Sequence, residues 1–427
     1  SVAVNQFHEV YSANWDYNPA GDITLTKRNS SGAILWSSTY DNTDNTRHEV
    51  ATWLETDSQN NCIVSGTIRS GYSNPVNAAS LLMKYNPQGV LLWRIVFESS
   101  FEGSSTRKIL VDSSNNIYVL GLGMGPNGMV TRIKKFNSSG QTIWTYNDVN
   151  GIGAPINIKF TPDNALVVSG RGITGIINGY LKISLEGSLI WSKAGITSPT
   201  IGDIAGDSIG NSYIINGENV VSNAGSILEK LDGNGILIWS HTNAMAGSKV
   251  EVGSDNYPII SGFPNSGTGG AAFMKYNSNS AILWQNLNAD GPEILLLHSQ
   301  LKIDTANNAY LSAGNLFNMA VCKINSDGTN GWVGLVSGSS QASSFVLDSN
   351  NSIYVIGGTT AKLGQSPLSN DMINLSEFLV FPNPFISDLT ILSKDVHGVK
   401  QLFIYDQTGK IIFQESFREL SKNINLS

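Results

Sequence analysis

The sequence predicts an all-β fold built from repeated four-stranded units, and three observations lead to this prediction. A ten-residue phrase, Lys-x-Asn-x-x-Gly-x-x-x-Trp, occurs seven times, with Ser184 and Asp232 in place of the Asn and Ser280 in place of the Gly. Its tryptophans follow one another at intervals of 45 to 57 residues, which is the period of a repeat architecture. Only 14% of the residues are charged and 43 of 427 are glycine, as in turn-rich β proteins. The seven phrases end at Trp36, Trp93, Trp144, Trp191, Trp239, Trp284 and Trp332.

Each repeat shows the pattern of four short strands, here termed a to d in chain order. Strands a and b are clearest at 109–121, where two alternating apolar runs flank an Asp-Ser-Ser-Asn turn and a Gly closes the second run. The Lys of the recurring phrase lies in strand c and its Trp in strand d. The Asn-x-x-Gly between them is typical of a tight hairpin turn. Four-stranded units of about 45 residues are the blades of β-propellers.

The repeats define the expected blades. Seven complete units are expected at 2–40, 48–98, 106–148, 153–195, 200–243, 247–288 and 297–336. A shorter unit at 344–357 has strands a and b but no matching Lys or Trp. We expect eight blades rather than seven, because an open sheet edge invites unwanted pairing and the ring has to close. A strand from upstream would complete the eighth blade.

The recurring Lys and Trp point to packing between blades. Both side chains can project to the same face of their hairpin, so that the Lys stem lies along the indole while its ammonium reaches water. A feature present in every blade indicates structure rather than an active site, since each buried Trp covers about 150 to 250 Å². Cys62 and Cys322 fall on units that are not neighbours, so we expect two free, buried thiols.

Charge and motif content exclude several function classes. The net charge of −7 leaves no basic surface for nucleic acid, and no apolar run approaches the roughly 20 residues that insert into a membrane. The Asp and Asn turns lack the Gly and the distal Glu of a calcium loop, and the five histidines show no pair at metal-ligand spacing. We therefore expect no metal and no cofactor.

Two acidic residues are the candidates for catalysis. Glu55 and Glu251 lie eleven residues before the closing Gly of their blades, where Ile303 and other apolar residues occur elsewhere. Carboxylates aimed at the axis from strand a would suit a polysaccharide-active enzyme. Lys159 occupies the same place in another blade, however, so charged side chains lining a wet channel are the simpler interpretation.

Loop lengths point to a binding face. The a–b and c–d turns are short and uniform, whereas the b–c and d–a connections are longer and uneven and gather on the opposite face. Variable loops on a rigid scaffold usually carry binding. A lectin with one sugar site per blade would need exposed aromatics at equivalent positions, and the aromatics in register are assigned to the core. The candidates for ligand binding, of residue types favoured at interaction hot spots, are Arg69, Tyr72, Phe101, Arg107, Tyr146 and Arg171.

A different domain is expected after the propeller. We place the propeller at 1–364, a polar linker at 365–376 and a small immunoglobulin-like β-sandwich at 377–427, with alternating strands and a hairpin at 406–409. The last segment carries two motifs, Phe-Pro-Asn-Pro and, about twenty residues later, Ile-Tyr-Asp-x-x-Gly-Lys. Their defining residues are Phe381, Pro382, Asn383, Pro384, Tyr405, Asp406 and Gly409.

These paired motifs resemble the C-terminal sorting domain of cargo exported by the type IX secretion system of Bacteroidetes. Members of that family usually continue into a Leu-x-x-Gly-x-Tyr strand and a basic tail, and the sequence stops before these, so a truncated copy is expected. The first 360 residues resemble bacterial secreted β-propeller-repeat proteins, with Asp-Ser-x-Asn-Asn-Ile-Tyr-Val as the shared phrase. The resemblance implies a secreted or cell-surface protein whose C-terminal domain engages the type IX translocon.

The sequence thus favours a non-catalytic binding or adhesion propeller that takes a glycan or a protein on its long-loop face. The alternative is a polysaccharide-active enzyme with Glu55 and Glu251 at the axial mouth.

Overall fold

The computed structural model describes the strands and most of the short turns that join them. The described residues are 1–15, 22–41, 48–69, 78–97, 105–125, 128–148, 152–171, 177–197, 202–216, 225–243, 245–264, 270–289, 300–314, 318–337, 344–357, 360–363, 378–381, 388–393, 400–405, 411–417 and 421–425. Among them there is no helix long and apolar enough to cross a membrane. The chain divides into two compact units, Ser1–Gln365 and Ser366–Ser427.

The first half of unit 1 forms four antiparallel sheets of four strands. Blade 1 contains β1 (Val2–Val4), β2 (Val10–Trp15), β3 (Ile23–Arg28) and β4 (Ile34–Tyr40). Blade 2 contains β5 (His48–Thr56), β6 (Cys62–Arg69), β7 (Ala79–Tyr85) and β8 (Leu91–Phe97). Blade 3 contains β9 (Thr106–Val111), β10 (Ile117–Gly125), β11 (Gly128–Phe136) and β12 (Thr142–Asp148). Blade 4 contains β13 (Ala154–Thr161), β14 (Ala165–Arg171), β15 (Ile177–Ser184) and β16 (Leu189–Thr197).

The second half repeats this plan. Blade 5 contains β17 (Asp203–Gly206), β18 (Ser212–Asn216), β19 (Ile227–Leu231) and β20 (Leu237–Thr242). Blade 6 contains β21 (Met245–Val252), β22 (Pro258–Pro264), β23 (Ala272–Tyr276) and β24 (Ile282–Asn286). Blade 7 contains β25 (Gln300–Ile303), β26 (Ala309–Gly314), β27 (Asn318–Ile324) and β28 (Asn330–Ser337). Blade 8 contains β29 (Ser344–Leu347), β30 (Ile353–Ile356) and β31 (Thr360–Leu363).

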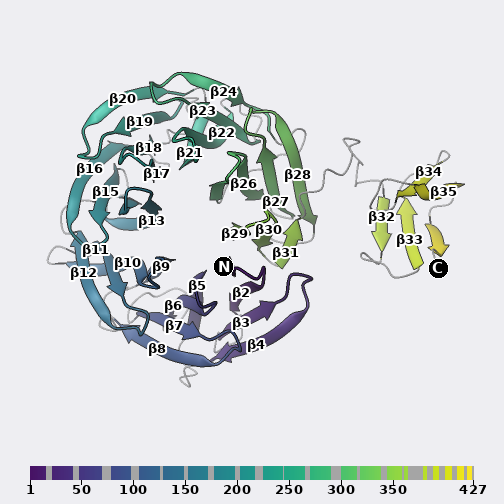
Figure 1. Cartoon of the computed structure of the whole chain (residues 1–427), viewed down its shortest axis with the longest axis horizontal. Coiled ribbons are helices and arrows are strands. Elements are labelled where there is room, and N and C mark those ends of the chain that lie inside the picture. Colours follow the sequence, from purple (N-terminus) through teal and green to yellow (C-terminus); the bar gives the residue numbers. More distant parts are fainter. Residues whose placement is uncertain are drawn as a thin grey trace. The chain divides into compact units, whose positions relative to one another are not determined.

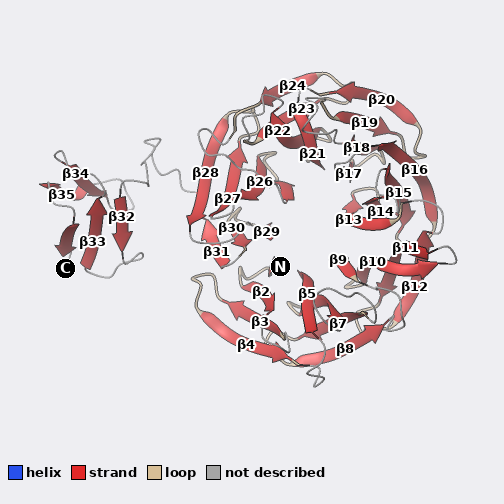
Figure 2. Ribbon diagram, turned by 180° about the vertical axis from the view of Figure 1, so that it is seen from behind, coloured by secondary structure: helices blue, strands red, loops and turns tan. Residues whose placement is uncertain are grey.

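These sheets form an eight-bladed β-propeller, which confirms the predicted fold and blade count. Strand a of each blade lies next to the central axis and strand d forms the outer rim (Figures 1 and 2). Blade 8 corrects one expectation, since its third strand carries the Lys that was thought to be missing. Lys362 pairs with Tyr354 in the register in which Lys323 pairs with Tyr310 in blade 7.

Side-chain caps hold the short turns. In the a–b turn of blade 2, Asp57 Oδ1 accepts the backbone N–H groups of Gln59 and Asn61, each at 2.9 Å, and Asn60 takes a positive φ of 63°. The Asp and Asn turns are therefore Asx turns whose carboxylate is occupied by the local backbone.

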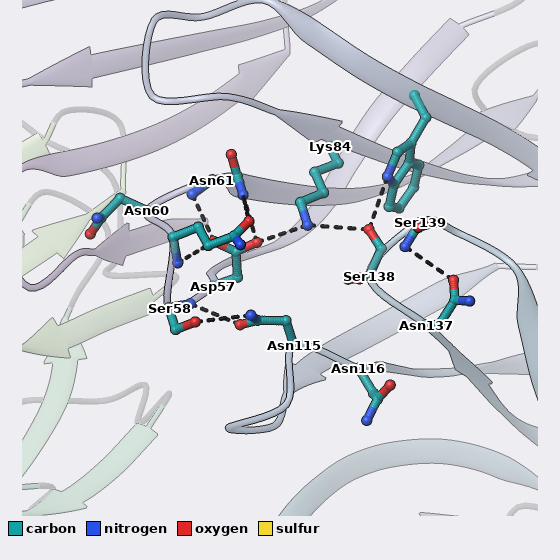
Figure 3. A network of polar contacts seen from close by, with 12 residues as sticks. Asp57, Ser58, Asn60, Asn61, Lys84, Asn115, Asn116, Asn137, Ser138 and Ser139 are labelled. Atoms are coloured by element: carbon teal, nitrogen blue, oxygen red, sulfur yellow. Dashed lines mark hydrogen bonds and ion pairs between the residues drawn. The ribbon is translucent and has the colours of Figure 1, made fainter.

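The recurring Lys and Trp clamp each blade to the next. In all seven phrases the Lys lies directly opposite the Trp across strands c and d. Figure 3 shows Lys84 between Asp57 of its own blade, at 2.8 Å, and the carbonyl of Ser138 in blade 3, at 3.2 Å. The indole N–H of Trp93 donates to the same carbonyl at 3.2 Å.

The same pair of bonds is present at four interfaces between blades, at distances between 2.9 and 3.3 Å, whereas the indole N–H groups of Trp191 and Trp332 have no hydrogen-bond partner among the described residues. The shared acceptors are Pro87 O for Lys27 and Trp36, Ser138 O for Lys84 and Trp93, Leu185 O for Lys135 and Trp144, and Ser278 O for Lys230 and Trp239.

The predicted role in packing between blades is thus confirmed, but the predicted exposure of the ammonium was wrong. Lys84 and Lys182 are buried, and four of these lysines form ion pairs at 2.6 to 2.8 Å with an acidic residue of their own a–b turn. Where strand b supplies a Tyr, the ammonium lies over that ring rather than over the indole, as for Lys135 above Tyr118 at 4.9 Å. Burial is stable here because the ammonium groups of six of the seven lysines meet an acidic or carbonyl oxygen, and that of Lys323 lies over the Tyr310 ring.

Blades 8 and 1 close the ring. The ring nitrogen Nδ1 of His8 lies 2.9 Å from Asp348 Oδ2, and Lys362 donates to the carbonyl of Ser30 at 3.3 Å. Val2 and Val10 of blade 1 pack with Tyr354 and other apolar residues of blade 8.

The two cysteines and the second unit complete the description. Cys62 and Cys322 are both buried thiols that form no disulfide, as predicted. Unit 2 contains a three-stranded sheet of β32 (Phe378–Phe381), β33 (Asp388–Ser393) and β36 (Ser421–Asn425), and a two-stranded sheet of β34 (Lys400–Tyr405) and β35 (Ile411–Phe417).

Candidate functional site

A tier of side chains from strand a surrounds the axis, and cross-strand pairing defines its members. In blade 2 the clamp residue Lys84 lies opposite Ile63, which lies opposite Glu55. The residues at this position in blades 1 to 8 are Ala3, Glu55, Leu110, Lys159, Ala205, Glu251, Lys302 and Val346.

One member of this tier corrects the sequence alignment. Counting back from the closing Gly placed Ile303 at the blade 7 position, but pairing with Tyr310 places Lys302 there. The count fails because Gly314 lies four residues after Tyr310, whereas Gly66 lies three residues after Ile63. The tier therefore contains one more cation than the sequence indicated.

A second tier lies two residues earlier on the same strands. Side chains on alternate positions of a strand share a face, so this tier stacks on the first. Its polar and aromatic members are Trp53, Lys108, Asn157, Asp203, Lys249, Gln300 and Ser344.

Lys159 is the centre of the polar network that joins the two tiers. Its ammonium contacts Asp203 Oδ2 at 2.8 Å, the carbonyl of Val250 at 2.8 Å and Glu251 Oε1 at 2.9 Å. The contacts with Val250 and Glu251 both reach from blade 4 to blade 6, past blade 5, which has the small Ala205 at the equivalent position. Burial would lower the pKa of Lys159, but Asp203 and Glu251 raise it above its ordinary value.

The network continues through blades 3 to 5. Lys108 donates to Asn157 Oδ1 at 2.9 Å, and the Asn157 amide donates to Asp203 Oδ1 at 3.0 Å. Burial would raise the pKa of Asp203, but the ammonium groups of Lys159 and Lys249 hold it below its ordinary value.

Glu55 lies at the other side of the tier, beside Trp53. The indole N–H of Trp53 donates to Glu55 Oε1 at 2.9 Å, and the Lys108 ammonium lies 5.0 Å from the centre of the Trp53 ring. Burial raises the pKa of the Glu55 carboxyl, against the opposing effects of the Trp53 hydrogen bond and of the Lys302 and Lys108 charges. Burial also lowers the pKa of Lys108 to about 8, and the positive charges of Lys159 and Lys302 add to this effect.

The two candidate catalytic acids are thus held differently. Glu251 is ion-paired with Lys159, while Glu55 accepts a hydrogen bond from an indole. Each carboxylate has a positively charged or hydrogen-bonding partner in the tiers. Charged side chains of the two tiers therefore surround the axis.

Four of the six residues predicted to bind a ligand from the loops lie on strands instead. Arg69 and Arg171 are half-buried at the ends of β6 and β14, Arg107 is exposed on β9, and Tyr146 on β12 packs against the apolar cluster shared by blades 3 and 4. Burial, together with the charge of Asp148, raises the pKa of Tyr146 to about 12. Tyr72 and Phe101 lie outside the described residues.

The sorting motifs are also only partly described. Phe381 ends β32 and Tyr405 ends β34, whereas Pro382, Asn383, Pro384, Asp406 and Gly409 lie outside the described residues.

Sequence reasoning missed most of the charged tiers. Lys108, Asp203, Lys249 and Lys302 were not identified, although each lies on a strand a that otherwise alternates apolar residues. For Lys108, Asp203 and Lys249, the signal available in the sequence was a charged residue two positions before the first-tier residue of the same strand. Within the described part of the chain, no three His, Cys, Asp or Glu residues are arranged to hold a metal ion.

Comparison with known proteins supports the fold. No protein-family model matches the chain, and no curated protein matches its sequence. Among solved structures, Sqt1 from Chaetomium thermophilum is 10% identical with a TM-score of 0.57, covering 85% of this chain and 95% of that one. The Dos1 propeller is 10% identical with a TM-score of 0.55, covering 84% and 90%. Hydrazine synthase from Kuenenia stuttgartiensis is 9% identical with a TM-score of 0.50, covering 75% and 96%. At these identities the likeness shows the propeller fold alone.

Proposed function

We propose that this protein is a non-catalytic binding or adhesion propeller, displayed outside the cell, which takes a glycan or a protein on its long-loop face. The observation that supports this most is the pairing of the axial charges. Glu251 is bound to Lys159 at 2.9 Å, so it lacks the freedom of a catalytic carboxylate that has to exchange protons with a substrate. A propeller clamped blade to blade is a rigid platform on which uneven loops can bind.

Binding is tested by screening the full chain on a glycan array. The Arg107→Ala variant is screened on the same array in parallel. Arg107 is exposed on β9 at the long-loop end of its strand, and its loss is expected to weaken binding at least about fivefold without lowering the melting temperature. Arg28→Ala is the matched control, since Arg28 bonds the carbonyl of Gly32 in a turn on the opposite face. Equal binding by all three proteins would place the ligand elsewhere.

The export proposal rests on the resemblance of the C-terminal motifs to type IX sorting domains. The chain is expressed in a Bacteroidetes host, with and without residues 366–427, and in a strain that lacks the type IX translocon. The full chain is expected at the cell surface only in the competent strain. Surface display of the shortened chain would refute this route.

A polysaccharide-active enzyme is the second candidate, and the raised pKa of Glu55 favours it, because a general acid has to be protonated. Plant and algal polysaccharides are incubated with the wild type and with the Glu55→Gln/Glu251→Gln variant. The binding proposal expects no sugar release by either protein. Release that the double variant loses would establish catalysis instead.

A further inference from the structure

A cavity beside the two axial tiers is not used by the binding proposal. It has a volume of about 310 Å³ and is lined by Glu251, Lys302, Ile303 and Leu347, from strands a of blades 6, 7 and 8. Ile303 and Leu347 immediately precede the a–b turns that begin at Asp304 and Asp348. The cavity therefore lies toward the short-turn face, at the opposite end of strand a from the long loops.

Lys302 gives this cavity a cationic wall. Its side chain is half-buried, and among the described residues no carboxylate lies within ion-pairing distance and no acceptor takes a hydrogen bond from it. Lys159, in the equivalent position of blade 4, meets three oxygen atoms. The Lys302 ammonium thus retains the capacity to bind a ligand that Lys159 has lost.

The charges of the two tiers do not balance. Lysines 108, 159, 249 and 302 face three acids, Glu55, Asp203 and Glu251. The effect is visible at Lys108, whose pKa is lowered to about 8 by burial and by the neighbouring positive charges of Lys159 and Lys302. An anion in the channel would relieve this repulsion.

The lining also offers two further kinds of contact. Glu251 is 27% exposed and uses Oε1 for Lys159, so its other oxygen can accept a hydrogen bond from a ligand hydroxyl. Ile303 and Leu347 supply an apolar surface. A volume near the lower limit of ordinary ligand pockets, about 300 Å³, indicates a ligand the size of one sugar ring or smaller.

We propose that this axial cavity binds a small anion, whose carboxylate or phosphate group lies against the Lys302 ammonium while its hydroxyl groups reach Glu251. This site lies toward the short-turn face, opposite the long loops. Substitutions at the cavity therefore test this proposal separately from binding on the long-loop face.

Calorimetric titration of the full chain tests this site. The probes are glucuronate, inorganic phosphate and methyl glucoside, each to roughly 10 mM, at which a site with a Kd of about 1 mM is mostly occupied. Glucuronate or phosphate is expected to bind and the neutral methyl glucoside is not. Glucuronate binding alone identifies the carboxylate of a sugar acid as the ligand group, and phosphate binding alone identifies a phosphate.

Variants with opposite expected effects make the test specific. Lys302→Met is expected to weaken binding about tenfold or more, because a charge-assisted hydrogen bond is lost, and Lys302→Arg to retain it. Glu251→Gln is expected to tighten binding by roughly threefold, because a negative charge beside the anion is removed. Lys193→Met, which removes a lysine paired with Glu229 away from the axis, is expected to bind as the wild type does.

Two results would overturn the proposal. One is the absence of heat with both anions. The other is an affinity that Lys302→Met leaves unchanged while its melting temperature matches the wild type.

Discussion

The c–d turns of blades 2, 3, 4, 5 and 7 each bring a glycine directly against the tryptophan of the preceding blade. Gly187 has a φ of +88°, and a Cβ at this position would lie 2.8 Å from Cδ2 of Trp144. Gly32 has nearly the same conformation, with a φ of +91°, but no atom would lie within 4 Å of its Cβ, since blade 8 places no Trp there. The two glycines therefore separate the cost of backbone strain from the cost of displacing an indole.

Gly32→Ala is expected to lower the free energy of unfolding by about 1 to 2 kcal/mol, the cost of a left-handed conformation for a residue with a Cβ. Gly187→Ala is expected to cost about 1 to 3 kcal/mol more, because Trp144 has to move out of its packing position. Chemical denaturation of both variants measures the difference. Equal losses would show that the indole adapts without cost.

Lys108 provides a test of the axial electrostatics. Its pKa in the folded protein is about 8, below its ordinary value of 10.5, so the unfolded chain binds more protons than the folded one between these values. Stability from this group therefore rises with pH across the window from about 8 to 10.5 and is constant below it. The charged groups that face it are Lys159, Lys302, Glu55 and Glu251.

The expected result is that raising the pH from about 7.5 to 9.5 stabilises the wild type relative to Lys108→Met. Taking the difference between the two proteins cancels the titration of other lysines and tyrosines. Unfolding free energies at the two pH values provide the measurement. A difference that does not change with pH would mean that the Lys108 ammonium is well solvated.

At the scale of the element, strand d combines one clamping residue with exposed aliphatic neighbours. Ile236 and Leu237 of blade 5 are 64% and 48% exposed, as are similar residues before the Trp in most blades. Blade 7 carries Thr329 and Asn330 at the corresponding places and forms the same sheet. The aliphatic side chains are therefore not required for the blade itself.

Leu237→Thr is expected to change the free energy of unfolding by less than about 0.5 kcal/mol, as for an ordinary surface position. Leu228→Thr is the control in the neighbouring strand β19, where Leu228 is fully buried, and it is expected to cost more than about 2 kcal/mol. Denaturation and sedimentation are measured together. A large loss or a change of mass with Leu237→Thr would reveal that another surface covers this strand.

The elements also show why part of the molecule could be predicted from the sequence. Lys84 and Trp93 could be predicted as a structural pair because each clamp uses the same residues at a fixed spacing across a short hairpin. The acceptor, the carbonyl of Ser138, was not predictable, because backbone atoms leave no signature in the sequence. Hence the packing role was inferred correctly and the burial of the ammonium was not.

The axial tiers were harder to predict. Lys302 was missed, and Ile303 was placed at its position, because the distance from the closing Gly to the strand pairing is not constant and is one residue longer at Gly314. The Lys159 contact with Glu251 joins strands about 90 residues apart, and only the ring brings them together. Lys362 was missed because it follows Tyr354 by eight residues and no Asn-x-x-Gly turn or Trp comes after it.

At the scale of the whole molecule, the interface between blades 8 and 1 differs from its neighbours because no tryptophan of the described residues packs against its c–d turn. Lys362 donates to Ser30, but no indole shares that carbonyl, and Gly32 lacks a tryptophan neighbour. The contacts of His8 with Asp348 and Asn350 and one small apolar cluster also join these two blades. In the described part of the chain, blade 8 also has three strands where the other blades have four.

The closing interface is therefore expected to open before the others. In native-state hydrogen exchange, the amides of β1 and β29–β31 are expected to exchange faster than those of β9–β12, because local opening follows the weakest packing. Lys362→Met is expected to accelerate exchange in blades 8 and 1 only, whereas Lys230→Met, which breaks the clamp onto Ser278, is expected to act on blades 5 and 6. Uniform exchange around the ring, or a global response to Lys362→Met, would show that the eight blades open as one cooperative unit and that closure carries no special weakness.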